Sequence, residues 1–223
     1  MTKIKKNSII CLKTRGSMYL NSPFHTFFTD LASEKSSPGG GSVAALTGVQ
    51  AVSLVLMVGR LTLGKKKYLD VQNQVETMIE KASILKESLL GKMEEDVIIF
   101  QEIMDTYKLK ASQREERLKK ALKKSAYFSL SMMDEGYQIL QLAKQIGEIG
   151  NKNLISDAAI AVILSISTME AAAVNVRINL KPLDNHEVTQ DIETQMKELF
   201  IKAYKLKEES FKVIDLSIQV SHP

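Results

Sequence analysis

Residues 38–46 read PGGGSVAAL, and one helix length later residues 61–68 read LTLGKKKY. The first stretch joins a glycine turn to an apolar run rich in small residues, and the second joins a glycine stop to three lysines. Glycine has no Cβ, so this turn allows a ligand or another backbone to approach closely. We expect a helix over 42–63 with Ser42 as its N-cap. Because its small side chains let partner helices come close, we expect this helix to be buried on most sides.

The other segments also have helical periodicity, and none alternates as a strand does over more than a few residues. The four prolines lie outside the long periodic segments, where they mark boundaries. The sequence therefore predicts a single-domain, all-α fold, an elongated bundle of about six long helices. The remaining expected helices are Pro23–Glu34 with Ser22 as N-cap, Tyr68–Leu109 with a bend or break at Gly91, Gln113–Ile149, Asn153–Leu180 with Ser156 as N-cap, and Val188–Val220.

Composition narrows the class of protein. The chain has 223 residues, a formal net charge of +4 and one cysteine, Cys11. The charge is mild and dispersed, which argues against a nucleic-acid partner. A single thiol without a secretory signal favours the cytoplasm, and the absence of a long uninterrupted apolar run argues against a membrane span. Residues 1–17 differ from the rest, so we expect a disordered leader followed by one helical domain at 18–223.

The sequence gives little support for a metal site or for a phosphate-binding loop. The three histidines, His25, His186 and His222, are scattered, and none has a partner at ligand spacing. We therefore expect no metal site. The glycine run is not a Walker loop, because its lysines come a whole helix later. Glycines and lysines that simply end helices would explain the same pattern.

Two carboxylates and two amides are the polar candidates for chemistry. Asp96 stands beside three apolar residues, where burial would raise its pKa and suit it to acid–base work, or it is an exposed helix residue next to two glutamates. Asp157 is a second candidate, although a carboxylate in a first helical turn is common. Asn175 and Asn179 share one face of an apolar helix, so their amides either bond between helices or recognise a polar ligand.

Taken together, these residues resemble the cyclodeaminase/cyclohydrolase family of folate enzymes. The resemblance covers roughly residues 23–220, and its pieces are individually weak but specific in combination. It is carried by Leu31–Ser33, residues 38–46, Met57–Val58, residues 61–68, Asp96 with Phe100 and Met104, Tyr107–Leu109, Gly150–Asn151, Ile155–Asp157, Glu170 and residues 175–180.

This resemblance implies a homodimer and a tetrahydrofolate derivative as substrate, with no metal. On it we expect Asp96 and Asp157 to act in acid–base chemistry or to anchor the pterin by a charge-assisted fork. The N–H groups of Gly39, Gly40, Gly41 and Ser42 would bind an oxygen, and Asn175 and Asn179 the pterin or the one-carbon unit. Lys65, Lys66 and Lys67 would attract the glutamate tail.

The sequence leaves two reactions of that family open. A methenyltetrahydrofolate cyclohydrolase is slightly favoured over a formimidoyltetrahydrofolate cyclodeaminase, because no formiminotransferase half accompanies the helices. A non-catalytic helical interaction protein is the alternative from another class, with the charged stretch 108–124 as its most obvious surface.

Overall fold

The computed structural model describes residues 18–184 and 186–218, so the expected leader at 1–17 lies outside the described part. The described residues contain no strand, which confirms the predicted all-α fold. Short 3₁₀ turns at Lys66–Val71 and Lys152–Leu154 precede the third and fifth helices. The α-helices are α1 (Phe24–Leu31), α2 (Gly40–Arg60), α3 (Gln72–Tyr107), α4 (Ala111–Ile149), α5 (Ile155–Leu180) and α6 (His186–Ile218).

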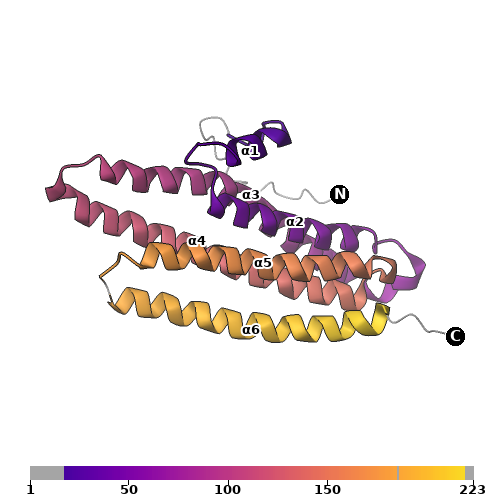
Figure 1. Ribbon diagram of the computed structural model, residues 1–223. Helices are drawn as coiled ribbons and strands as arrows, with labels where there is room; N and C mark the ends of the chain where they lie inside the picture. Colours follow the sequence, from indigo (N-terminus) through magenta and orange to yellow (C-terminus); the bar gives the residue numbers. More distant parts are fainter. Residues whose placement is uncertain (1–17, 185, 219–223) are drawn as a thin grey trace, which may run out of the picture.

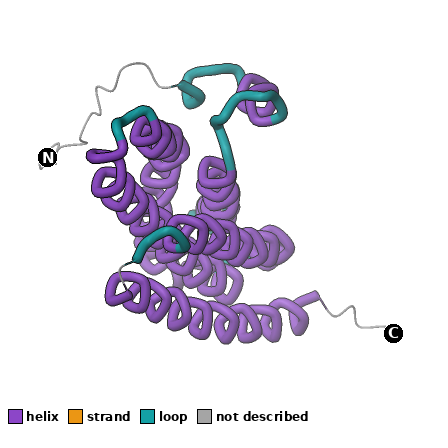
Figure 2. The backbone as a smooth tube through the Cα atoms, turned by 60° about the vertical axis from the view of Figure 1, so that its left-hand side comes forward, coloured by secondary structure: helices purple, strands orange, loops and turns teal. Residues whose placement is uncertain are grey.

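Four of the long helices form an elongated bundle (Figure 1). α2 packs between α3 and α5, and α4 closes the bundle on the other side, with its largest contact to α5. α6 lies along α4 and α5, while the short α1 lies outside the bundle (Figure 2) and buries Phe27 in an apolar cluster that includes Met93 of α3. The start of α2 lies beside the end of α5, because Gly40 neighbours Asn175. These two helices therefore run antiparallel.

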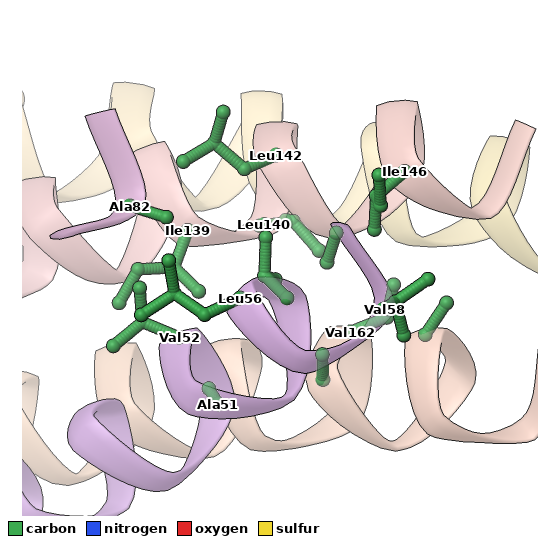
Figure 3. Close-up of a cluster of buried hydrophobic side chains, with 14 of the residues drawn as sticks. Ala51, Val52, Leu56, Val58, Ala82, Ile139, Leu140, Leu142, Ile146 and Val162 are labelled. Carbon is green, nitrogen blue, oxygen red and sulfur yellow. The ribbon is translucent and has the colours of Figure 1, made fainter. Parts of the chain in front are cut away.

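Small residues allow α2 to enter the middle of the bundle. Ala51 and Val52 are fully buried and share one apolar cluster with Ile139 and Leu140 of α4 (Figure 3). At Gly48 a Cβ would lie 2.9 Å from a methyl group of Leu89 on α3, and it would also approach α5. Burial of apolar surface is the main stabilising contribution to such a bundle, and here it depends on close approach to α2.

Several expected helix boundaries are wrong by one to four residues. α2 begins at Gly40, with Gly39 as N-cap, so Ser42 is not the N-cap but lies in the first turn. The reason is that the Ser42 N–H finds its acceptor on α3 instead of needing a local cap. α5 begins at Ile155 rather than after Ser156, because the preceding 3₁₀ turn, capped by the Asn151 side chain, leads directly into it.

At the start of α1, Pro23 itself is the N-cap, and the Ser22 hydroxyl donates to the Met18 carbonyl instead of capping the helix. The expected bend or break at Gly91 is also wrong, since α3 is one helix from Gln72 to Tyr107. A glycine inside a helix weakens it without having to interrupt it.

Two helices, α2 and the segment Lys152–Leu180, are long and apolar enough to cross a membrane by length and composition. About half of each is buried inside the bundle, as in the core helices of many soluble proteins. Packing inside the chain therefore explains why one side of each helix is apolar. It does not explain the apolar residues on the exposed side.

We predict opposite effects of alanine at two helical glycines. Gly91→Ala would raise the free energy of unfolding by about 0.5–1 kcal/mol, because alanine favours the helix and a Cβ there meets nothing within 4 Å. Gly48→Ala would lower it by about 1–3 kcal/mol through overpacking against Leu89. Urea unfolding of both variants checks this pair, and a stabilised Gly48→Ala variant would contradict the packing described for α2.

Candidate active site

A cavity of about 290 Å³ lies at the start of α2, where the loop before α2 and the last turns of α5 meet interior turns of α3 and α4. Its lining includes one carboxylate and no basic side chain. This volume is near the lower limit of small-molecule pockets, so the cavity encloses a ligand head group rather than an extended molecule. The lining residues are Ser36, Ser37, Gly39, Gly40, Gly41, Asp96, Phe100, Ile103, Ser125, Ser129, Asn175, Ile178 and Asn179.

The carboxylate of Asp96, on α3, is fixed to the first turn of α2. Its Oδ2 accepts hydrogen bonds from the Ser42 N–H at 2.8 Å and from the Ser42 hydroxyl at 3.0 Å. The same hydroxyl lies 3.0 Å from the Met93 carbonyl oxygen, the second acceptor within its reach. Asp96, which belongs to α3, thus accepts a hydrogen bond from an N–H group in the first turn of α2. A negative charge is favoured at this end of a helix.

Burial raises the pKa of the Asp96 carboxyl above its ordinary value of 3.8, although the two hydrogen bonds from Ser42 act in the opposite direction. Oδ1 accepts no hydrogen bond from the described residues, and the side chain lines the cavity. The carboxylate therefore has one anchored oxygen and one oxygen available to a ligand. A raised pKa in a cavity is the expected property of an acid–base group.

Two glycines permit the close contacts at this end of α2. A Cβ at Gly41 would overlap the Asp96 carboxylate, so only glycine allows that carboxylate to lie against the helix. A Cβ at Gly40 would lie 3.6 Å from Oδ1 of Asn175. The N–H groups of Gly40 and Gly41 have no acceptor among the described residues, so they are available to an oxygen of a ligand.

The two asparagines of α5 differ in their contacts. The Asn179 amide donates to Ser125 Oγ of α4 at 2.9 Å and to the Asn175 carbonyl at 2.8 Å, so it bonds between helices as well as lining the cavity. The Asn175 amide makes no hydrogen bond to any described residue and lies next to Gly40. Asn175 is therefore the amide that is available to a ligand, with both donor and acceptor capacity.

The structure does not bring the remaining predicted residues to this cavity. Asp157 lies in the first turn of α5, about 27 Å along the helix from Asn175 at 1.5 Å per residue. Lys65, Lys66 and Lys67 follow the far end of α2, about 30 Å from Gly40 by the same rise. Both groups lie at the opposite end of the bundle within one chain, where their roles stay predictions.

Seven lining residues were not assigned to the site from the sequence: Ser36, Ser37, Phe100, Ile103, Ser125, Ser129 and Ile178. Ser125 and Ser129 are buried and lie one turn apart on α4, and Phe100 lies one turn after Asp96 on α3. The serines could have been found as a polar pair at helical spacing within a buried stretch. Serines inside helices so often bond to their own backbone that this signal is weak.

The described residues contain no group of three or more histidine, cysteine, aspartate or glutamate side chains that could hold a metal ion. The polar groups that line the cavity are one carboxylate, helix N–H groups, two asparagine amides and four serine hydroxyls.

Comparison with known proteins shows which family the chain is similar to. A family model described as formiminotransferase-cyclodeaminase matches residues 23–198. The chain is 33% identical over 200 residues to a methenyltetrahydrofolate cyclohydrolase from Methylorubrum extorquens, covering 87% of this chain and 96% of that protein. It is 24% identical over 170 residues to the formimidoyltransferase-cyclodeaminase of Rattus norvegicus, and spans only 31% of that protein's length.

The fold is also similar to a solved structure. The crystal structure of formiminotetrahydrofolate cyclodeaminase from Thermotoga maritima superposes with a TM-score of 0.83 at 27% sequence identity. The match covers 87% of this chain and 96% of that chain, so the similarity extends over nearly the whole helical bundle.

We predict that alanine substitutions at Gly41 and at the nearby Gly39 have different effects on stability. Gly41→Ala would displace Asp96 and lower the free energy of unfolding by about 1–3 kcal/mol, because the hydrogen bonds from Ser42 are lost in a partly buried position. Gly39→Ala would change it by less than about 0.5 kcal/mol, since its φ of −136° suits any residue and its Cβ meets nothing. Equal stabilities of the two variants in urea unfolding would disprove the contact.

Proposed function

The chain belongs to the formiminotransferase-cyclodeaminase family, and we propose that it is a methenyltetrahydrofolate cyclohydrolase, which converts 5,10-methenyltetrahydrofolate and water to 10-formyltetrahydrofolate. The relative with that name supports this reaction, because the match covers 96% of its length. The geometry that supports the proposal is the Asp96 carboxylate, which lines the cavity, is anchored through Oδ2 by Ser42 and has no hydrogen bond from the described residues at Oδ1.

The reaction needs one group that moves protons. Water adds to the carbon between N5 and N10 and loses a proton, which gives a neutral tetrahedral adduct. The bond from that carbon to N5 then breaks, N5 gains a proton and the hydroxyl loses one, which leaves the formyl group on N10. The net products are 10-formyltetrahydrofolate and one proton. General acid–base catalysis by a positioned side chain accelerates such steps by about 10²–10⁴-fold.

Asp96 is suited to proton transfer more than to a bidentate pterin fork. A fork needs both carboxylate oxygens, whereas Oδ2 already accepts two hydrogen bonds from Ser42. Oδ1 remains available to accept the proton of the attacking water. The substrate carries a positive charge on its N5–C–N10 bridge, and a cavity lined by one carboxylate and no basic side chain favours that charge.

The other open groups would orient the substrate. Gly40, Gly41 and Asn175 line the same small cavity as Asp96, and Gly40 lies next to the Asn175 amide. In our proposal they bind oxygen and nitrogen atoms of the pterin or of the one-carbon unit, while Asn179 fixes α5 against α4 through Ser125. The aminobenzoyl-glutamate part would extend outside, because the cavity is too small for a whole folate.

We further expect a homodimer that works in the cytoplasm and binds neither nucleic acid nor membrane, in keeping with a dispersed net charge of +4. The assignment of Asp157 and of Lys65–Lys67 to the substrate also belongs to this proposal.

A second candidate reaction has a specific observation in its favour. The solved structure that matches with a TM-score of 0.83 is that of a formiminotetrahydrofolate cyclodeaminase. In that reaction N10 attacks the 5-formimidoyl carbon and ammonia leaves, so the same carboxylate would protonate the departing nitrogen. A helical interaction protein without activity, the remaining alternative, would bind no reduced folate.

An absorbance assay separates these possibilities. 5,10-Methenyltetrahydrofolate absorbs in the near ultraviolet, so a cyclohydrolase makes this signal decay faster than in buffer alone. A cyclodeaminase makes the signal appear from 5-formimidoyltetrahydrofolate. We expect enzyme-dependent decay, and faster appearance than decay at equal substrate concentration would favour the deaminase. No change in either direction would contradict both reactions.

The pH dependence of the same assay tests Asp96. The base must be ionised, so kcat/KM should rise with pH through the pKa of Asp96, and burial places this rise above the ordinary value of 3.8. Asp96→Asn should lower kcat by about 10²–10⁴-fold and remove this limb of the profile. Asp105→Asn, on the same helix but in an exposed ion pair with Lys108, is the matched control and should leave both unchanged. An intact acid limb in Asp96→Asn would remove Asp96 from the mechanism.

A further inference from the structure

Ser125 and Ser129 are two buried residues of α4 to which the proposed reaction gives no role. They lie one turn apart, are 8% and 2% exposed, and both line the same cavity as Asp96. A hydroxyl group in such a position must find a hydrogen-bond partner, because an unpaired buried polar group costs free energy. The hydrogen bonds that each serine makes or lacks therefore indicate what kind of ligand atom would lie beside it.

Most other buried hydroxyl groups in the long helices donate to the backbone of their own helix. Ser165, Thr168 and Ser210 each donate to the carbonyl oxygen four residues earlier, at 2.7 or 2.8 Å. This bond is a common arrangement for a serine or threonine inside a helix. Neither Ser125 nor Ser129 donates to an acceptor among the described residues, so their hydroxyl protons are available to a ligand in the cavity.

A neighbouring carbonyl group determines which atom donates in the contact between Ser125 and Asn179. Nδ2 of Asn179 lies 2.8 Å from the backbone oxygen of Asn175 and 2.9 Å from Oγ of Ser125. A carbonyl oxygen only accepts, so the first contact identifies this atom as the amide nitrogen. Its second hydrogen then binds Oγ, so the Ser125 hydroxyl accepts from Asn179 and keeps its own proton for another acceptor.

Ser125 and Asn179 therefore present one donor and one acceptor to the cavity. Both hydrogens of the Asn179 amide are used within the protein, and its Oδ1 accepts no hydrogen bond from the described residues. Asn179 thus offers a ligand only an acceptor, whereas Ser125 has one lone pair occupied and a free proton to donate. Ser129 lines the same cavity without a hydrogen bond to a described residue, so its hydroxyl can rotate and serve in either sense.

The lactam edge of a pterin has the complementary pattern. In a 4-oxo pterin the ring N3–H donates and the adjacent 4-oxo group accepts, so the first suits Oδ1 of Asn179 and the second suits the Ser125 hydroxyl. A 4-amino pteridine reverses both atoms, because its N3 accepts and its 4-amino group donates. Donor would then meet donor and acceptor would meet acceptor, which leaves buried polar groups of the protein unpaired. Hydrogen-bond direction, rather than shape, would distinguish the two rings.

We propose that Ser125, oriented by Asn179, is a specificity-determining residue of this cavity and selects a 4-oxo over a 4-amino pteridine ring. The proposal rests on the proposed function for the class of ligand, but ligand binding tests it without turnover. In a reduced pterin the 4-oxo group lies beside N5, so a ring bound in this way keeps the one-carbon bridge in the same small cavity as Asp96. Helices α4 and α5 then recognise the ring, and α3 supplies the group that transfers protons.

Binding of two matched ligands tests the proposal. Tetrahydrofolate and 4-amino-4-deoxytetrahydrofolate are titrated without oxygen into the purified chain, in a buffer basic enough to keep both rings neutral, and calorimetry gives the two dissociation constants. We expect the wild-type chain to bind tetrahydrofolate at least about 100-fold more tightly. In Ser125→Ala this ratio should fall about tenfold, because alanine removes both the hydrogen bond to the 4-oxo group and the conflict with the 4-amino group.

Two further serine variants separate this role from a structural one. Ser129→Ala should weaken both ligands alike and leave the ratio unchanged, since its hydroxyl serves in either sense. Ser165→Ala, at a buried serine of α5 that donates to the Ala161 carbonyl, should change neither dissociation constant. Circular dichroism checks that each variant is folded. If Ser125→Ala does not fold, Ser125→Cys carries the same expectation, because a thiol is only a weak donor.

Equal affinity of the wild-type chain for the two ligands would overturn the proposal, and so would a ratio that is the same in Ser125→Ala as in the wild type. Failure of the wild-type chain to bind tetrahydrofolate at millimolar concentration would overturn it as well. Selective binding without turnover of 5,10-methenyltetrahydrofolate would contradict the proposed reaction and leave this proposal standing. Turnover without a preference between the two rings would do the reverse.

Discussion

The contact on which the site depends is the one between the Asp96 carboxylate and the first turn of α2. Two donors of Ser42 hold Oδ2, and the absence of a Cβ at Gly41 gives the carboxylate its place. This single contact satisfies an N–H group at the N-terminus of α2, joins α3 to α2 and leaves Oδ1 without a hydrogen bond from the described residues. In this account, Oδ2 holds the two helices together and Oδ1 takes part in the reaction. Burial raises the pKa of the carboxyl group.

The antiparallel packing of α2 and α5 determines which residues can cooperate. It places Gly40 beside Asn175 at one end of the bundle and joins Thr62 to Asn151 at the other. Small residues along α2 make this close packing possible, so the same feature of the sequence explains both the core and the site. The bundle consequently has two polar ends, with the cavity at one and the lysine turn at the other.

Much of the fold and about half of the site followed from the sequence. Helical periodicity predicted the all-α bundle. The residue pattern singled out the glycine turn, Asp96, Asn175 and Asn179 as candidates with alternatives left open, and the family resemblance assigned them to the site. The N-cap at Ser42 was wrong because its N–H is satisfied by Asp96, a residue distant in the sequence. Periodicity indicates which face of a helix is buried, but not which ends lie together, so it could not separate Asp157 and Lys65–Lys67 from the cavity. Ser125 and Ser129 were missed because buried helical serines usually carry no such role.

The most direct test of the central contact is the ionisation of Asp96 itself, followed by carboxyl ¹³C NMR with assignment from Asp96→Asn. We expect this carboxyl to titrate above 3.8 in the free protein and its resonance to shift when a tetrahydrofolate binds. A carboxyl that titrates at or below 3.8 and does not respond to saturating folate would contradict the account.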